Sequence, residues 1–269
     1  MPSWENFGSL VCGKTDVLKI RAELHIHTVL SPCAEVEMIP PLIVQEALRR
    51  DVKLIAITDH NASANIQAVI GAAQNSGVIV LPGMEVQTRE EVHLLCLFDT
   101  TEQISAWQEI VDSSLPDREN DAEYFGEQFI VDETGDYIRS EQRLLATATT
   151  LTFEQAVTKV ENLGGLAIPA HVERKAYGLL GVLGFVPPNV HLEALEISRL
   201  IKPAEAIQRF PQLAGFPLIT NGDVHRLDEF LGITEFIVEA ATISEIQLAL
   251  RNAQGRSFRI GEQRVNNVI

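Results

Sequence analysis

The sequence predicts an α/β domain in which a mainly parallel sheet closes into a barrel. Three observations favour this fold class. Strand-like and helix-like segments alternate seven or eight times along the 269 residues. This length suits one large domain, and 46% hydrophobic residues are typical of a globular core. Six of the seven histidines lie at or beside the ends of apolar runs, where an α/β barrel carries its chemistry.

The first half of the chain alternates regularly. Apolar runs of strand length are separated by segments with helical periodicity, and Pro40 is suited to open the first helix. Ser63 is expected to cap the second helix and Gly77 to end it. The elements expected in this half are strands at 18–27, 53–58, 78–85 and 91–98 and helices at 40–51, 63–77 and 101–113.

A polar, acidic stretch from about residue 115 to residue 150 interrupts the alternation. It contains FIVDETGDYI, whose central ETGD predicts a turn between two short strands. We therefore expect an insertion with a hairpin, within a single domain that spans residues 1–269. The elements expected after it are a helix at 152–165, strands at 165–171, 192–198, 216–223 and 234–240, and a helix at 243–252, before a polar tail.

Two architectures are compatible with this alternation. A closed barrel gathers the carboxyl ends of all strands on one face and brings His25 next to His225. An open doubly wound sheet would instead string the first and last histidine motifs along an edge or crevice. The alternation favours the barrel.

Composition restricts the classes of partner. The 21 basic and 37 acidic side chains give a formal charge of −16, which argues against a broad surface for long nucleic acids. We expect a small phosphorylated substrate, because bound divalent ions and loop arginines can still attract a phosphate. No apolar run approaches the roughly 20 residues that span a bilayer, and the first residues do not resemble a secretory signal. We expect a cytoplasmic protein without membrane contact, and the sequence leaves its oligomeric state open.

Two pairs of residues have the spacing of metal ligands on a strand. Residues at i and i+2 point to one face, so His25 and His27 can reach a single ion, and Asp223 and His225 repeat this geometry. Glu85 ends an apolar run, where an ionised carboxylate is costly unless it is paired or bound to metal. Imidazole and carboxylate together suit manganese, zinc or iron.

The other candidates differ in the strength of their patterns. His171 ends a strand-like run and is followed by charged residues, which favours a ligand. Alone, His93 is more typical of a hydrogen-bonded core histidine, and His191 precedes its strand, which indicates a structural role. Glu196 and Asp59 can each orient a ligand imidazole, although Asp59 can equally satisfy backbone donors in a turn.

In order along the chain, the segments HIHT, ITDHN, GMEV, EVHLLCLF, PAHVER and NGDVHRLDE resemble the successive motifs of the PHP (polymerase and histidinol phosphatase) family. The similarity runs from about residue 21 to residue 239, and the motifs also resemble those of stand-alone metal-dependent phosphoesterases in the family. It implies a distorted seven-stranded β/α barrel with two or three divalent ions.

The resemblance also implies a set of ligands. His25, His27 and Asp223 would hold one ion, and Glu85 would bridge it to a second. The second ion would be held by His93 and His171, and a third by His60 and His225. Many relatives carry a further ligand to the third ion at the position of Pro32 here. Cys33, Glu35 or Glu37 can substitute for it, and the sequence does not choose among them.

The expected activity is hydrolysis of a small phosphate monoester or diester by metal-activated hydroxide. Glu85 would bridge the ions, and His60 or His225 would protonate the leaving group if the third ion is absent. Arg174, Arg199 or Arg226 would orient the phosphate. Two alternatives stay open: a catalytically silent metal-binding module acting in stability or partner docking, and hydrolysis of C–N bonds. The last is disfavoured because no lysine stands at a strand end to bridge two ions.

Overall fold

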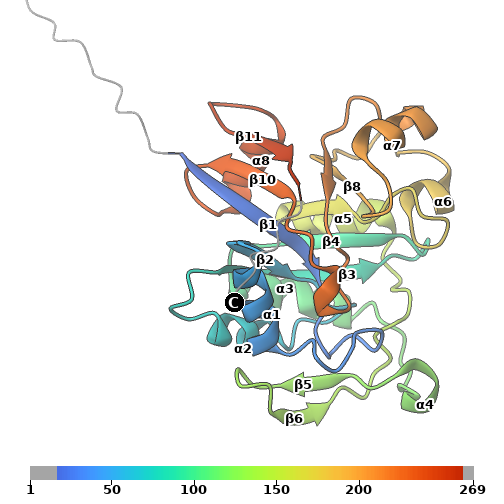
Figure 1. Ribbon diagram of the computed structural model, residues 1–269. Coiled ribbons are helices and arrows are strands. Elements are labelled where there is room, and N and C mark those ends of the chain that lie inside the picture. The colour runs from blue at the N-terminus through green and yellow to red at the C-terminus, as the bar shows by residue number, and fades with distance from the viewer. Residues whose placement is uncertain (1–16, 263–269) are drawn as a thin grey trace, which may run out of the picture.

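The computed structural model describes residues 17–262, and its main sheet is strongly curled (Figure 1). The strands of this sheet are β1 (Leu18–Ile26), β2 (Leu54–Ile57), β3 (Ile79–Gln87), β4 (His93–Leu97), β7 (Leu166–Pro169), β10 (Thr234–Val238) and β11 (Ser257–Ile260). They are paired in the order β11-β10-β1-β2-β3-β4-β7. β2 and β7 are apolar throughout, and β4 is apolar after His93, as expected for strands covered on both faces.

A second, two-stranded sheet closes the curl. It contains β8 (Leu195–Ile197) and β9 (Leu218–Thr220), which run parallel. On one side the N–H of Val172, just after β7, donates to the carbonyl of Glu196 at 2.9 Å. On the other side the N–H of Val224, just after β9, donates to the carbonyl of His25 at 2.9 Å. The first and last histidine motifs therefore meet, and the predicted distorted barrel is confirmed.

The strand directions differ from the predicted parallel sheet. β1, β2 and β3 are parallel, but β4 is antiparallel to both β3 and β7, and β10 and β11 extend the sheet antiparallel beyond β1. A parallel pair needs a crossover of a dozen or more residues, whereas only the short segment between Gln87 and His93 connects β3 to β4. Because β4 runs backwards, its first residue lies beside the end of β3.

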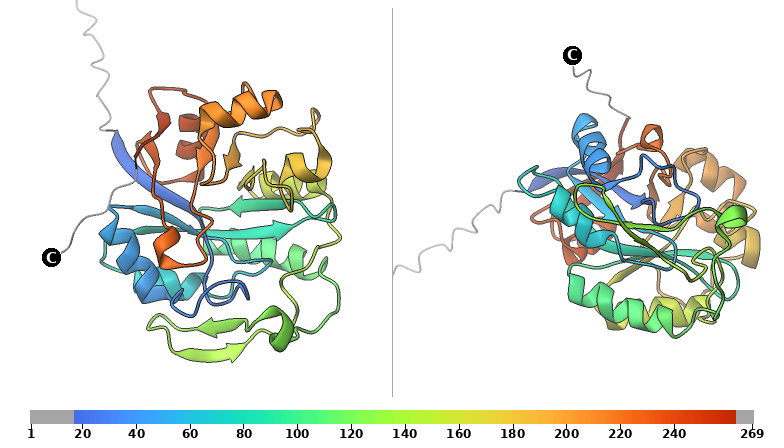
Figure 2. Two further views of the ribbon diagram at one scale, coloured as in Figure 1. Left: turned by 45° about the vertical axis from the view of Figure 1, so that its right-hand side comes forward. Right: turned by 90° about the horizontal axis from the view of Figure 1, so that it is seen from below.

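Helices cover the outside of the barrel, and α1 and α2 pack side by side (Figure 2). The five predicted helices are present as α1 (Pro40–Arg49), α2 (Ile66–Ala72), α3 (Thr101–Asp112), α5 (Phe153–Asn162) and α8 (Ile243–Leu250). Short helices α4 (Ala122–Phe125), α6 (Leu179–Leu183) and α7 (Pro203–Arg209) and the 3-10 turns η1 (Pro211–Leu213) and η2 (Leu227–Glu229) complete the set. None of the helices between residues 17 and 262 has the length and apolar character required to cross a membrane.

Pro40 begins α1, as predicted. Thr100 and Thr152 form capping boxes with Gln103 and Gln155, which satisfy the first free N–H groups of α3 and α5. The predicted cap of α2 is wrong, because that helix begins later, at Ile66, and no side chain caps it. The hydroxyl of Ser63 instead donates to Gln108 of α3 at 2.8 Å.

The segment between about residues 115 and 150 packs beside the barrel's carboxyl end and contains the predicted hairpin, β5 (Phe129–Val131) and β6 (Tyr137–Ser140) (Figure 1). The N–H of Phe129 donates to the carbonyl of Val29, and Asn65 Nδ2 donates to the carbonyl of Phe129, both at 2.9 Å. The insertion is therefore attached to the loop that follows β1. Assignment of residues 1–269 to one domain remains a prediction.

The expected polar tail contains a strand instead. β11 pairs with β10, and Arg259 lies directly opposite Glu235 in the register. The Arg259 guanidinium donates to the buried Glu235 carboxylate at 2.5 Å, and Lys19 lies 3.1 Å from it. Opposite charges facing each other across two strands stabilise the pairing, so a charged segment can continue a sheet.

A buried ion-pair network joins α1 to the loop after β9. The Glu46 carboxylate accepts from the guanidinium groups of Arg49 and Arg50, and Arg50 also donates to the carbonyl of Phe230. Burial raises the pKa of Glu46, but its bonds to Arg49 and Arg50 outweigh burial and lower the pKa below its ordinary value of 4.5.

Glu46→Gln is expected to lower the free energy of unfolding by about 1.5–3 kcal/mol at pH 7, the usual contribution of hydrogen bonds to charged groups. A depressed pKa stabilises the fold above pH 4.5, the ordinary value, and this contribution is lost as the pH falls through the lower folded-state value. Urea unfolding curves of the two proteins should therefore converge below pH 4.5. A difference in the free energy of unfolding between the two proteins that stays constant with pH would contradict this account.

Candidate metal centre

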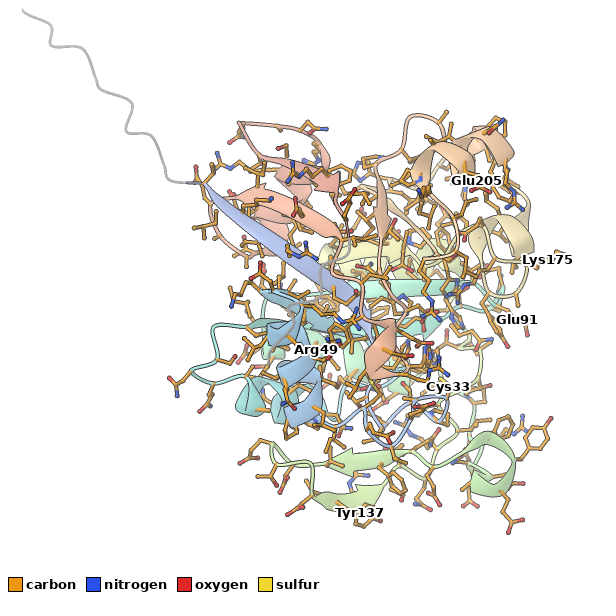
Figure 3. All side chains as sticks on the ribbon, viewed as in Figure 1. Cys33, Arg49, Glu91, Tyr137, Lys175 and Glu205 are labelled. Carbon is orange, nitrogen blue, oxygen red and sulfur yellow. The ribbon has the colours of Figure 1, made fainter. Side chains whose placement is uncertain are left out.

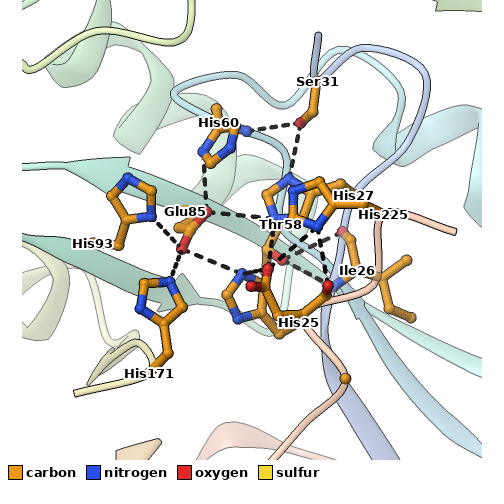
Figure 4. Close-up of polar contacts among 12 residues, drawn as sticks. His25, Ile26, His27, Ser31, Thr58, His60, Glu85, His93, His171 and His225 are labelled. Carbon is orange, nitrogen blue, oxygen red and sulfur yellow. Dashed lines mark hydrogen bonds and ion pairs between the residues drawn. The ribbon is translucent and has the colours of Figure 1, made fainter. Parts of the chain in front are cut away.

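Side chains from six strands, or from the loops that follow them, meet at the carboxyl end of the barrel. Tight packing allows this: a Cβ added to Gly83 in β3 would lie 2.9 Å from the carbonyl oxygen of Ile57 in β2. The residues that the structure brings together here are His25, His27, His60, Glu85, His93, His171, Asp223 and His225 (Figure 4).

The Glu85 carboxylate lies at the centre of this cluster and is 1% exposed. The N–H of Glu85 donates to the carbonyl of Asp59, and its carbonyl accepts from the N–H of Asn61, which fixes the end of β2 beside β3. Five imidazole nitrogens surround its two oxygens: His93 Nδ1 at 2.8 Å, His60 Nδ1 at 3.0 Å, His25 Nε2 at 3.3 Å, His171 Nε2 at 3.3 Å and His27 Nε2 at 3.4 Å.

Asp223 forms a second anionic point in the cluster. Its Oδ1 lies 3.2 Å from His25 Nε2, 3.6 Å from His27 Nε2 and 3.5 Å from His225 Nδ1. The backbone of Asp223 has φ 53°, in the left-handed region that aspartate tolerates better than most residues. This bend directs the aspartate and the following histidine towards the ends of β1 and β3.

Glu196 orients His25. Its carboxylate accepts from His25 Nδ1 at 3.1 Å, from Asn221 Nδ2 at 2.7 Å and from the N–H of His171 at 3.1 Å. A carboxylate only accepts, so Nδ1 of His25 carries a proton, which leaves Nε2 as the ring atom available to an ion. The orienting role considered for Glu196 agrees with this geometry.

Ser31 and Asp59 orient His27 in the same way. The Ser31 hydroxyl donates to Asp59 at 2.7 Å and lies 2.9 Å from His27 Nδ1. Because the hydroxyl proton is used, the Ser31 oxygen accepts from His27 Nδ1, which leaves His27 Nε2 free for the cluster. Asp59 also accepts from the N–H of Thr28 at 2.7 Å. Both roles considered for Asp59 are therefore combined in one side chain.

Several atoms of the cluster lie close together without forming hydrogen bonds. Among the described residues, these buried atoms of the cluster have no hydrogen-bond partner: His25 Nε2, His27 Nε2, His93 Nδ1, both oxygens of Glu85 and Asp223 Oδ1. Leaving so many buried polar atoms unpaired is costly. Lone pairs that converge on shared points are the arrangement that metal ligation requires, so the donor set fits divalent ions.

Charges and burial within the cluster keep its two carboxylates and His93 in the protonation states that metal ligands need. Burial alone would raise the pKa of Glu85, but His93 and His25 hold it well below its ordinary value. Burial also opposes ionisation of Asp223, whose pKa His25 and His27 nevertheless lower. For His93, burial of the ring outweighs the attraction of the Glu85 charge and lowers the pKa to about 4. At neutral pH both carboxylates are therefore anionic and His93 is neutral.

The geometry groups the ligand atoms into three sets of close neighbours. The sets are His25, His27 and Asp223; His60, Glu85 and His93; and His27, His60 and His225. Within each set all ligand atoms lie within 4.8 Å of one another. The first set is the one that the family resemblance implies for one ion. The second set contains Glu85 and His93 but has His60 in place of His171, and the third adds His27 to His60 and His225. The assignment of ligands to individual ions remains a prediction.

The arginines expected to bind phosphate lie at the rim of the cluster. Arg174 Nη1 donates to Asp223 Oδ2 at 2.5 Å, and Arg199 donates to the carbonyl of Gly222 and to Glu229, both at 2.8 Å. Arg226 lies between 3.5 and 3.8 Å from three carboxylates. All three are engaged with the loop that carries Asp223, and their contact with phosphate remains a prediction.

Two features of the site were missed in the sequence. Ser31 carries no strand or helix pattern, and only its position four residues after His27 could have suggested it. Tyr177 stacks on His93 with ring centroids 4.4 Å apart and an interplanar angle of 11°. The carbonyl of Tyr177 accepts from the N–H of His93 at 2.9 Å. His191 lies away from the cluster, is exposed and faces Glu161.

A profile of the PHP domain matches residues 23–165, more than half of the chain. The chain belongs to the PHP domain family. No curated protein matches it in sequence. The candidate ligands from His25 to His93 lie within the matched segment. His171, Asp223 and His225 follow it.

Solved structures share the fold over more of the chain. A lesion-specific endonuclease Q from Pyrococcus furiosus is 20% identical, with a TM-score of 0.63 over 90% of this chain and 58% of that chain. The endonuclease Q in a complex with a 27-mer duplex that carries an abasic lesion is 19% identical. Its TM-score is 0.64 over 89% of this chain and 58% of that chain. A two-domain protein from Bacteroides vulgatus that contains a predicted PHP-like metal-dependent phosphoesterase is 13% identical. Its TM-score is 0.53 over 91% of this chain and 66% of that chain. This PHP domain chain therefore has the fold of PHP-like metal-dependent phosphoesterases and spans a little over half of endonuclease Q.

The prediction of a small substrate, with long nucleic acid as an unlikely partner, is wrong. The error lies in arguing from the net charge of the chain. Endonuclease Q, which shares this fold, binds a 27-mer duplex with its lesion at the active site. A net charge of −16 describes the whole surface. Binding of a phosphate backbone depends instead on the local potential, to which bound divalent ions and nearby arginines contribute.

Proposed function

We propose that this PHP domain chain hydrolyses phosphoester bonds with the help of two or three divalent ions. One observation carries the proposal. A fully buried carboxylate, Glu85, faces five imidazoles whose lone pairs converge without hydrogen bonding to it. Two-ion sites that share such a bridging carboxylate are typical of enzymes that displace oxygen at phosphorus.

The position of each residue in the cluster indicates which ion it would hold. His25, His27 and Asp223 would hold one ion, His93 and His171 a second, with Glu85 between them. When bound, such ions lower the pKa of a water molecule and stabilise charge on phosphoryl oxygens. Manganese, zinc and iron all suit this set of imidazole and carboxylate ligands.

The remaining polar groups would handle protons and the phosphate. His60 and His225 either help to hold a third ion or, without one, protonate the leaving alkoxide. His225 Nδ1 donates to the carbonyl of Asp223 at 3.0 Å, which leaves Nε2 facing the site. Arg174 and Arg199 are 33% and 30% exposed and can turn towards a bound phosphate.

The substrate class is a phosphoester, and it includes the phosphodiester bonds of DNA. The fold shared with endonuclease Q supports testing damaged duplexes beside small esters. This chain covers 58% of the endonuclease Q chain, so cleavage of DNA by this chain alone is part of the proposal.

The test is elemental analysis of the purified chain together with a substrate panel. Metal-free protein is supplied separately with Mn²⁺, Zn²⁺ or Fe²⁺, and offered phosphomonoesters, phosphodiesters and duplexes with or without an abasic site. We expect hydrolysis in at least one arm, and its loss on chelation. Metal-loaded protein that cleaves none of these would reject the proposal and favour a silent metal-binding module.

A further inference from the structure

The loop after β1 brings Cys33 against the third group of ligands. Ser31 Oγ accepts from the N–H of His60 at 3.1 Å, and the N–H of Glu35 donates to the carbonyl of His225 at 2.9 Å. The loop is therefore attached to His60 on one side and to His225 on the other. Cys33 lies midway between these two attachments, between the barrel and the inserted segment (Figure 3).

The two glutamates that could replace Pro32 as a ligand lie elsewhere. Glu35 is 53% exposed at its side chain and lies 3.8 Å from Arg226. Both Glu35 and Glu37 line a surface groove formed with Arg226 and its neighbours. Pro32 itself faces the insertion, because a Cβ on Gly126 would lie 2.5 Å from the Pro32 carbonyl oxygen. Of the three candidates, Cys33 is the one found in contact with imidazoles, those of His225 and His60.

The thiol of Cys33 lies in contact with the imidazoles of His225 and His60. A cysteine binds a metal ion as the thiolate, so the thiol would release its proton when an ion binds between these side chains. Cys33 also remains exposed to reagents at the surface.

An independent observation marks the same position as a site. His27 is fully buried, its Nε2 has no hydrogen-bond partner among the described residues, and it converges with His60 and His225. The rings of His27 and His225 are stacked with centroids 4.2 Å apart. Neither ring donates a hydrogen bond to the other, so hydrogen bonding does not explain why the two rings lie so close together.

We propose that Cys33 is a thiolate ligand of a third ion, held together with His60 and His225. Sulfur ligands favour zinc and other soft ions over magnesium and manganese. The third position should therefore select zinc, while the Glu85 positions accept a wider range. This inference rests on the proposed metal-dependent function, and its test measures coordination rather than turnover.

The experiment is X-ray absorption at the zinc edge on the full chain, with zinc counted by elemental analysis. The wild-type protein should show a sulfur neighbour at about 2.3 Å. Cys33→Ser should lose this sulfur and bind the third zinc at least about tenfold more weakly, since even outer-shell partners contribute that much. The matched controls Cys96→Ala, in the buried core of β4, and Cys12→Ser, outside the described residues, should keep it.

A second measurement needs no variant. Zinc should slow alkylation of Cys33 by iodoacetamide at least about tenfold, followed by peptide mass spectrometry, and manganese should slow it less. A sulfur signal that is missing from wild type, kept in Cys33→Ser or lost in Cys12→Ser would overturn the assignment, as would alkylation that zinc leaves unchanged. A sulfur-ligated protein without hydrolysis would reject the proposed function alone.

Discussion

Glu85→Gln is expected to abolish phosphoester hydrolysis while the protein stays folded. The amide has nearly the same shape as the carboxylate but loses its charge, and its N–H₂ group faces imidazole nitrogens that lie 2.8–3.4 Å away in the wild type. The ions would lose their shared anionic ligand. Residues that act as one unit typically cost at least about a thousandfold in rate when one is removed.

The stability of the Glu85→Gln variant separates this effect from misfolding. Ions that bind only the folded state raise its unfolding temperature, so wild type should gain stability on adding Zn²⁺ or Mn²⁺ and the variant should gain little. Glu235→Gln is a matched control, because this equally buried glutamate pairs with Lys19 and Arg259 far along the sheet. Wild-type rates in Glu85→Gln would remove the mechanism.

The second large effect is expected from Glu196→Gln, which leaves every ligand in place. Glu196 accepts bonds from His25, Asn221 and the backbone of His171, so an amide there would direct N–H groups at donors. His25 would lose the bond that fixes the orientation of its ring and the proton on Nδ1. Loss of such a partner typically weakens metal binding roughly 10- to 100-fold.

Competition with a chelator measures this loss of affinity. Glu193→Gln is the control, since Glu193 lies three residues earlier, is also buried and pairs with Arg251 away from the cluster. Equal zinc affinities in Glu196→Gln and Glu193→Gln would show that Glu196 does not orient His25.

Much of the cluster could be predicted because local pattern and chemistry agree. The spacing of His25 and His27 on a strand, and Glu85 at the end of an apolar run, are visible in a few residues. His93 was weaker, since its position at the site depends on β4 running backwards. The short connection from Gln87 to His93 was the available signal for that direction.

The parts that could not be predicted depend on contacts between distant segments. Ser31 acts through Asp59, 28 residues later, and Tyr177 stacks on His93 from a loop after β7. Neither contact follows the periodicity of a helix or a strand, so neither is visible in the sequence. The strand β11 was missed because its pairing depends on Arg259 meeting Glu235 across the sheet rather than on an apolar pattern.

Anomalous diffraction from crystals soaked in zinc or manganese tests most directly whether these side chains hold metal. We predict two peaks on either side of the Glu85 carboxylate, one beside His25 and Asp223 and the other beside His93 and His171. With zinc, a third peak should lie beside Cys33. Peaks found only elsewhere on the molecule, or none at saturating metal, would contradict the account.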